Sequence, residues 1–162
     1  MNFLSATQYL PATLLALLLA FTPAAADDQV RLSAGQTVYV PVYANVFSGP
    51  KALPFHLAAM LSIRNTDPFH PLKVTTIEYY DNDGRLVKKY LDKPLNLGPL
   101  ASSHTYIKEG DDGGGFGANF IVRWDAAKEI NAPIIESVMI GAKSGQGISF
   151  ISQGQVISEK TR

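Results

Sequence analysis

The chain has 162 residues, with 14 basic and 14 acidic side chains, so its formal net charge is zero. Nucleic-acid binding depends on basic side chains that neutralise phosphates, so a neutral chain without a basic cluster is not expected to bind nucleic acid. The chain has no cysteine, which excludes disulfide bonds, thiolate metal sites and a cysteine nucleophile. Its stability must therefore come from an apolar core, and 46% of its residues are hydrophobic.

The first 26 residues have the layout of a secretory signal peptide. Leu14 to Phe21 form an unbroken apolar run, and the small residues Ala24 to Ala26 form a cleavage pattern before Asp27. The run is shorter than the ~20 residues needed to cross a bilayer, so no stable membrane insertion is expected after cleavage. We predict a signal peptide over residues 1–26 and a periplasmic or secreted chain over residues 27–162. Because no Lys or Arg precedes the run, a misassigned start or a buried N-terminal helix are the alternatives.

Beyond the signal peptide, apolar and polar residues alternate with period two between turn-forming residues, a pattern typical of strands. The expected strands are Val38 to Tyr43, Phe55 to Arg64, Val74 to Tyr80, Leu86 to Leu91, Ser103 to Lys108, Ala118 to Asp125, Ile134 to Ile140, and Ile148 to Ile151, with a continuation through Val156 and Ile157 left open. Pro41 cannot donate to a ladder, so its strand is expected at an edge or a bulge. Asp83-Gly84 predicts a hairpin turn. Only Ala126 to Asn131 looks briefly helical.

Seven or eight short strands without a long helical period predict an all-β fold. We expect a single immunoglobulin- or fibronectin-like β-sandwich over residues 27–162, with a polar tail at residues 158–162. Trp124 lies in a central strand of this pattern and is expected to fill the core between the two sheets.

The three histidines, His56, His70 and His104, are the first candidates for metal ligands. Imidazole and thioether ligands suit copper, which draws attention to His56 and Met60. These two residues lie four positions apart on the outward side of one expected strand, which separates them by about 13 Å at ~3.3 Å per residue. No native metal site is therefore predicted on the histidines, unless the fold brings two of them together.

The Gly-rich acidic loop at residues 109–117 offers a second set of metal candidates, Asp111 and Asp112. Carboxylates and carbonyls in such a loop could bind calcium weakly, and a mobile solvated loop is the favoured alternative. Asp81 to Gly84 does not match the EF-hand spacing and is better explained as a hairpin. We predict no metal and no cofactor.

No catalytic motif withstands inspection. Ser48 to Lys51 matches Ser-x-x-Lys, and Lys143 to Gly145 resembles its partner element in penicillin-interacting enzymes. The serine of that motif begins a helix, whereas Gly49 and Pro50 prevent one. The glycines at residues 113–117 precede a strand rather than a helix N-terminus, so they do not form a phosphate site. The chain is therefore predicted not to be an enzyme.

Tyr39, Pro41 and Tyr43 share the side of their strand opposite the valines. If this side is exposed, it forms a Tyr-rich patch of the kind enriched at interfaces. Along an edge, a partner strand could also add to it. The alternative is that a neighbouring loop covers the tyrosines.

Several segments resemble one uncharacterised bacterial family, the domain of unknown function 3124. They are Thr37–Tyr43 (TVYVPVY), Leu61–Pro68 (LSIRNTDP), Tyr79–Gly84 (YYDNDG), Lys89–Leu91 (KYL), Gly117–Val122 (GANFIV) and Gly147–Ile151 (GISFI). The resemblance covers roughly Gly35 to Val156 and implies a bacterial exported domain with no assigned activity and no functional residues to carry over. A weaker likeness, to the fibronectin-like domain of water-stress and late-embryogenesis proteins, concerns the fold alone.

These observations favour an exported, non-catalytic cell-envelope module that binds a protein or glycan partner. The expected contacts are Tyr39, Pro41 and Tyr43 and the loop at residues 109–117. The alternative is a periplasmic protein that binds a metal or a small ligand through His or Asp side chains. The sequence does not indicate an oligomeric state.

Overall fold

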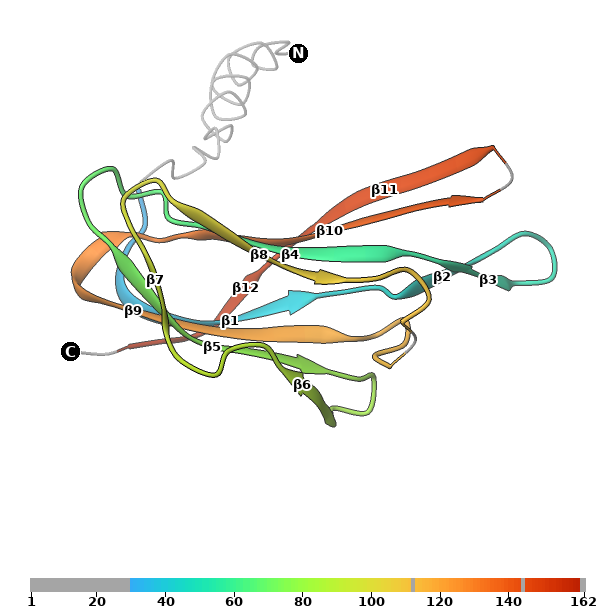
Figure 1. The fold of residues 1–162 in the computed structure, drawn as a ribbon, viewed down its shortest axis with the longest axis horizontal. Helices are drawn as coiled ribbons and strands as arrows, with labels where there is room; N and C mark the ends of the chain where they lie inside the picture. The colour runs from blue at the N-terminus through green and yellow to red at the C-terminus, as the bar shows by residue number, and fades with distance from the viewer. Residues whose placement is uncertain (1–29, 112, 144, 161–162) are drawn as a thin grey trace, which may run out of the picture.

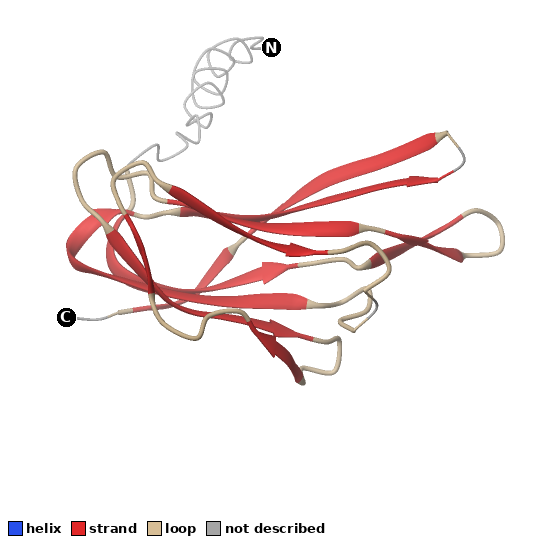
Figure 2. Ribbon diagram, viewed as in Figure 1, coloured by secondary structure: helices blue, strands red, loops and turns tan. Residues whose placement is uncertain are grey.

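A computed structural model describes residues 30–111, 113–143 and 145–160. The expected signal peptide and Asp112 lie outside the described residues. The described part of the chain contains strands and no helix, which confirms the all-β prediction (Figure 2). None of it therefore forms a helix that could cross a membrane. The strands are β1 Leu32–Pro41, β2 Asn45–Ser48, β3 Leu53–His56, β4 Ala58–Arg64, β5 Leu72–Tyr80, β6 Leu86–Lys89, β7 Leu95–Leu97, β8 Ser102–Ile107, β9 Asn119–Asn131, β10 Ile134–Lys143, β11 Gln146–Gln153 and β12 Gln155–Glu159.

The strands form two main antiparallel sheets that lie over one another as layers (Figure 1). The larger sheet has the order β12-β1-β9-β5-β6, and β7 also pairs with β5. The smaller sheet has the order β11-β10-β4-β8. A separate two-stranded hairpin, β2–β3, extends from one end of the molecule (Figure 1).

The core lies between the two layers and is built by alternate residues of both sheets. Trp124 is 3% exposed and belongs to this core, as its position in the sequence predicted. The second expected strand is divided into β3 and β4. The alternate residues on its inward side are nevertheless all buried: Phe55, Leu57, Ala59, Leu61 and Ile63. The buried side chains of the larger sheet include Val38, Val40, Val74, Ile77, Tyr79, Phe120 and Val122, and those of the smaller sheet include Ala59, Leu61, Ile63, Ile135 and Met139.

The strand that contains Pro41 is an inner strand of the sheet, but the proline itself lies where one side of that strand is free, so the expected edge is found only locally. β1 lies between β12 and β9, but β12 pairs only with Gln36 to Tyr39 and ends before the proline. The amide of Val42 donates to the carbonyl of Ala118 on the β9 side. The carbonyl of Pro41 points the opposite way and accepts the hydroxyl of Ser137. The proline nitrogen therefore faces the side where β12 no longer runs, so no ladder bond is lost.

The segment expected to be helical, Ala126 to Asn131, continues strand β9 instead. Ser33 of β1 pairs with Ile130, and Gly35 pairs with Asp125, so residues 126–129 form an irregular insertion opposite a single residue of β1. Ile130 returns to the core and is 1% exposed. Pairing with β1 on both sides of the insertion outweighs the helix preference of the Ala-Ala-Lys-Glu stretch.

The expected hairpin between β5 and β6 is confirmed. Asp81 closes it, because its amide donates to the carbonyl of Arg85 at 3.0 Å. Its side chain also accepts the amides of Asp83 and Arg85 at 2.9 and 2.8 Å. Gly84 has a φ of 75°, a conformation that glycine adopts without strain. This turn pairs β6 with the end of β5 and places Lys89 opposite Glu78.

Candidate interaction face on the larger sheet

The outward side of the larger sheet carries a set of half-buried apolar side chains, which we call the outer face. Val38 and Val40 point into the core, so Tyr39 and Pro41 point outward. Strand register places Ile121 of β9 opposite Tyr39. It also places Tyr80 of β5 in the same cross-strand row as Pro41, through Asn119. Tyr39, Pro41, Ile121 and Tyr80 are all half-buried and together form one continuous surface over three neighbouring strands.

A charged cluster centred on Glu78 borders this apolar surface. Glu78 lies opposite Ile121 in β9 and Lys89 in β6, and its side chain is only 11% exposed. Its carboxylate accepts the Tyr80 hydroxyl at 3.0 Å and the Arg123 guanidinium at 3.1 Å. The Lys89 ammonium lies 3.4 Å from its other oxygen. Two cations therefore share one carboxylate, which leaves the cluster with one excess positive charge.

The same contacts set the protonation states of the cluster. Burial by itself would raise the pKa of Glu78, but Arg123, Tyr80 and Lys89 together hold it below its ordinary value. Burial and the hydrogen bond to Glu78 raise the pKa of the Tyr80 hydroxyl. Glu78 is therefore ionised and Tyr80 neutral at physiological pH, so the cluster holds a fixed charge pattern. A shallow pocket between β5 and β6 borders Glu78 and Lys89.

Tyr39, Pro41 and Tyr43 were expected to share one side of a strand, but the structure separates Tyr43 from the other two. Tyr39 and Pro41 lie on the outer face, but Tyr43 lies beyond the end of β1. Its ring packs edge-on against Phe150 of β11, with ring centroids 5.5 Å apart. Tyr43 therefore joins the two sheets at the margin of the core. A partner strand cannot add beside Tyr39, because Tyr39 already pairs with Gln155 of β12.

The Gly-rich loop at residues 109–117 folds back on the sheet, at the end where β5 and β6 meet. The carbonyl of Gly115 accepts the amide of Ala44, and the amide of Gly117 donates to the Asn82 side chain at 3.2 Å. A Cβ atom at position 114 would lie 2.0 Å from the Tyr79 hydroxyl oxygen. Gly114 and Gly115 are thus closely packed, whereas Glu109, Gly110, Gly113 and Phe116 are exposed, so only part of the loop is solvated as expected. Asp111 accepts the amide of Gly113 within the loop.

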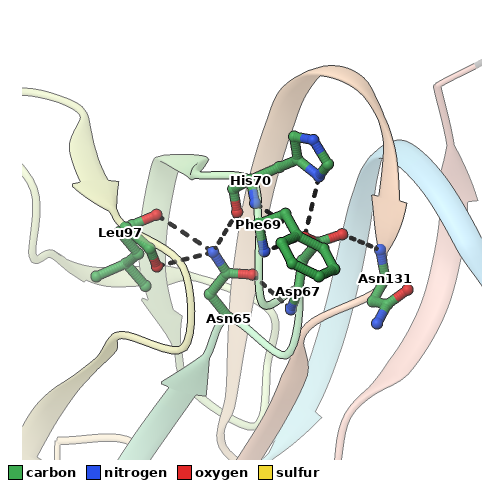
Figure 3. Close-up of polar contacts among 7 residues, drawn as sticks. Asn65, Asp67, Phe69, His70, Leu97 and Asn131 are labelled. Carbon is green, nitrogen blue, oxygen red and sulfur yellow. Dashed lines mark hydrogen bonds and ion pairs between the residues drawn. The ribbon is translucent and has the colours of Figure 1, made fainter.

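The Asn65-Thr66-Asp67 segment forms the densest hydrogen-bond network of the described residues (Figure 3). Asp67 accepts the backbone amides of Phe69, His70 and Asn131 at 2.8, 2.9 and 3.2 Å. The Asn65 amide group donates to the carbonyls of His70 and Gly98, both at 2.8 Å. Burial alone would raise the pKa of Asp67, but the backbone amides of Phe69, Asn131 and His70, together with the His70 ring, lower it to about 2.

This network explains the position of His70, whose Nδ1 lies 3.0 Å from Asp67 Oδ1. The three expected histidines are otherwise on separate elements. His56 pairs with Asn45 in the β2–β3 hairpin, and His104 lies on β8 opposite Ser62. Among the residues that the structure describes, no three His, Asp or Glu side chains are grouped so as to hold a metal ion.

The sequence alone did not identify Ile121 and Tyr80 as part of the outer face, or Glu78 and Arg123 as the charged cluster beside it. Period-two alternation with Phe120, Val122 and Trp124 already places Ile121 and Arg123 on the outward side of the strand expected at Ala118 to Asp125. The missing information was sheet order, because about half of the chain separates β1 from β9 in the sequence. Only their pairing brings these residues beside Tyr39.

The fold and the outer face define an all-β protein with an aromatic, partly charged sheet surface. The chain belongs to the family described as Protein of unknown function (DUF3124), which matches residues 35–157. No curated protein matches the sequence. Among solved structures, the crystal structure of Thermotoga maritima 1070 is similar at 11% identity. The match covers 77% of this chain and 97% of that one, with a TM-score of 0.47.

Proposed function

We propose that this protein is an exported, non-catalytic module that binds a protein partner through its outer face. The observation that carries the proposal is the continuous surface of Tyr39, Ile121 and Tyr80 over neighbouring strands. Tyrosine and arginine are the residue types most enriched at protein interfaces, and rigid aromatic rings lose little entropy on binding. Arg123 at the margin of the surface adds to this composition.

The charged cluster indicates what the partner should present. Glu78 is already shared by Arg123 and Lys89, whose side chains are 45% and 64% exposed. A partner carboxylate placed beside the apolar surface would meet the excess positive charge. Such a contact adds specificity and speeds encounter more than it adds affinity. We therefore expect a partner with apolar side chains and an acidic group, and a glycan is the alternative that the experiment must separate.

Export, an immunoglobulin- or fibronectin-like fold and a non-catalytic role belong to the same proposal. The signal-peptide pattern supports export to the periplasm or beyond. The two stacked antiparallel sheets around a single core support an immunoglobulin- or fibronectin-like arrangement. The absence of a catalytic motif in the sequence supports a binding role rather than an enzymatic one.

The test is a crosslinked pull-down of the purified protein from its native envelope, read by mass spectrometry. Tyr39→Ser removes the aromatic side chain that β1 contributes to the outer face. Tyr106→Ser is the matched control, because Tyr106 is 59% exposed and lies on the other sheet. We expect Tyr39→Ser to lose a partner that Tyr106→Ser retains, with both variants showing the same thermal unfolding temperature. Equal retention by the two folded variants would refute the outer face as the binding surface.

Capture must also be repeated after deglycosylation and after protease treatment of the envelope extract. A protein partner is lost on proteolysis and retained on deglycosylation. The opposite result would replace the protein partner by a glycan.

A further inference from the structure

The two main sheets end in five edge strands, because β6 and β7 both lie on the outer side of β5, and these strands differ in how they are protected. β7 is only three residues long. An exposed edge presents unpaired amides and carbonyls, and proteins usually block it with short strands, lysine or proline. In the larger sheet, β6 is four residues long and contains two lysines, and β12 is five residues long and contains Glu159. In the smaller sheet, β8 is six residues long and contains His104. β11 is eight residues long and contains neither a charged residue nor a proline.

We propose that the unprotected edge of β11 pairs antiparallel with β11 of a second copy of this chain. β11 pairs with β10 on one side only, and no described strand lies on its other side. The β10–β11 hairpin projects from the body of the molecule, which leaves its outer margin accessible (Figure 1). The surface belongs to the smaller sheet, so this proposal is independent of the outer face on the larger one.

β11 carries no charge that would oppose pairing with a second copy of itself. In a two-fold antiparallel pair, the strand lies opposite itself, so a charge near the axis would approach its identical copy. Like charges directly opposite one another destabilise a strand pair. The sequence from Gly145 to Ser158 contains no charged residue, so self-pairing meets no such repulsion anywhere along the strand.

The side chains around this edge also suit self-pairing. On the outward side of the smaller sheet, one cross-strand row is apolar from edge to edge: Ile151, Val138, Met60 and Tyr106. Ile151 is 59% exposed. A two-fold axis perpendicular to the sheet keeps this side on the same side in both copies. The two rows therefore lie on one surface of a continuous sheet, and each Ile151 is covered near the axis.

The size of the contact predicts a weak, concentration-dependent dimer. Eight residues at ~3.3 Å each give a paired strand roughly 26 Å long. One pair of strands with its flanking side chains lies at the low end of specific interface sizes, below roughly 1,200 Å² in total. We therefore expect exchange between monomer and dimer rather than an obligate dimer.

Sedimentation equilibrium over a wide concentration range tests the proposal, with hydrogen exchange at low and high concentration as the second readout. The variant is Ile151→Lys, which places a charge at the proposed interface. The matched control is Ile157→Lys on the edge strand β12, because Ile157 is 56% exposed. A second variant, Ile140→Lys, changes the outward side of β10 beside β11 and separates edge pairing from face-to-face docking.

We expect Ile151→Lys to weaken dimerisation by at least about tenfold, because two lysines then approach one another across the axis. We expect Ile157→Lys to leave the dissociation constant unchanged. Amides on the free side of β11 should become protected from exchange only at high concentration. A protein that is monomeric up to millimolar concentration would overturn the proposal, as would equal effects of the two lysine variants. A dimer weakened most by Ile140→Lys, without protection of β11 amides, would replace it by face-to-face docking.

Discussion

Replacing Tyr79 by phenylalanine is expected to stabilise the protein, although Tyr79 is among its most buried residues. The side chain is 2% exposed, and its ring packs on Phe120 with centroids 5.1 Å apart. No described residue provides a hydrogen bond to its hydroxyl, which Gly114 covers closely. A buried polar group without a partner costs roughly 1–3 kcal/mol, whereas the cavity left by one oxygen atom costs only a few tenths. We therefore expect Tyr79→Phe to raise the free energy of unfolding by about 1 kcal/mol.

The adjacent tyrosine provides the matched control for this prediction. Tyr80 donates its hydroxyl to Glu78 at 3.0 Å, so Tyr80→Phe removes a bond to a charged acceptor. That substitution should lower the free energy of unfolding by about 1 kcal/mol. Urea denaturation at neutral pH measures both variants, and the prediction is that their effects have opposite sign.

The effect of pH gives the same reasoning a second, independent check. Burial raises the pKa of Tyr79 from 10.0 to about 12, with smaller contributions from Asp111 and Tyr90. Between these two pH values the unfolded chain has released this proton and the folded chain still holds it. The wild type therefore loses stability as pH rises through this window, by at most about 1.4 kcal/mol per pH unit. Tyr79→Phe lacks the group, so its advantage over the wild type should grow from pH 10 to pH 12.

Two results would refute this account of Tyr79. One is that Tyr79→Phe lowers the free energy of unfolding by more than about 1 kcal/mol, which would mean that a buried water molecule satisfies the hydroxyl. The other is a difference between variant and wild type that stays constant from pH 10 to pH 12.

Three further predictions concern packing and the hydrogen-bond network. Gly114→Ala should destabilise by roughly 1–3 kcal/mol, because its Cβ would lie 2.0 Å from the Tyr79 hydroxyl. Gly98→Ala has open space around its Cβ and should change the urea midpoint little, so equal effects would contradict the packing argument. Asp67→Asn should destabilise at neutral pH, and its deficit should shrink as pH falls from 3.8 to about 2; a deficit that is constant in acid titrations would exclude the carboxylate as its cause. Tyr43→Ala should lower the thermal unfolding temperature through the lost contact with Phe150, and an unchanged temperature would show that this contact adds nothing.

Alternation along single strands was enough to predict much of the fold. The inward sides of the strands around Val38, Leu61 and Val122 were predicted correctly, since burial of one sheet side imposes period two. The turn at Asp83-Gly84 was likewise predicted from local chemistry. These features depend only on residues close together in the sequence, so local patterns are enough to predict them.

The errors arose where distant pairing decides the structure. Pro41 predicted an edge or a bulge, but only the pairing shows that β1 is an inner strand and that β12 stops before the proline. Residues 126–129 favour a helix locally, but β1 pairs on either side of them. The outer face was incomplete for the same reason, because Tyr39 and Tyr80 become neighbours only through β9, which lies between their strands.

The passage from β11 to β12 bears on how the chain folds. Gly154 is the single residue between the two strands, and each strand belongs to a different sheet. Its amide donates to the carbonyl of Ile135 at 2.8 Å, and a Cβ would lie 2.6 Å from both that carbonyl oxygen and Val38. β1 is one of the first strands synthesised, yet its partner strands are β9 and β12. β1 therefore has no partner until β9 has been synthesised, and its other side stays unpaired until β12 emerges. Pairings between strands so distant in the sequence form slowly. The larger sheet therefore cannot be completed before the segment after Gly154 has been synthesised.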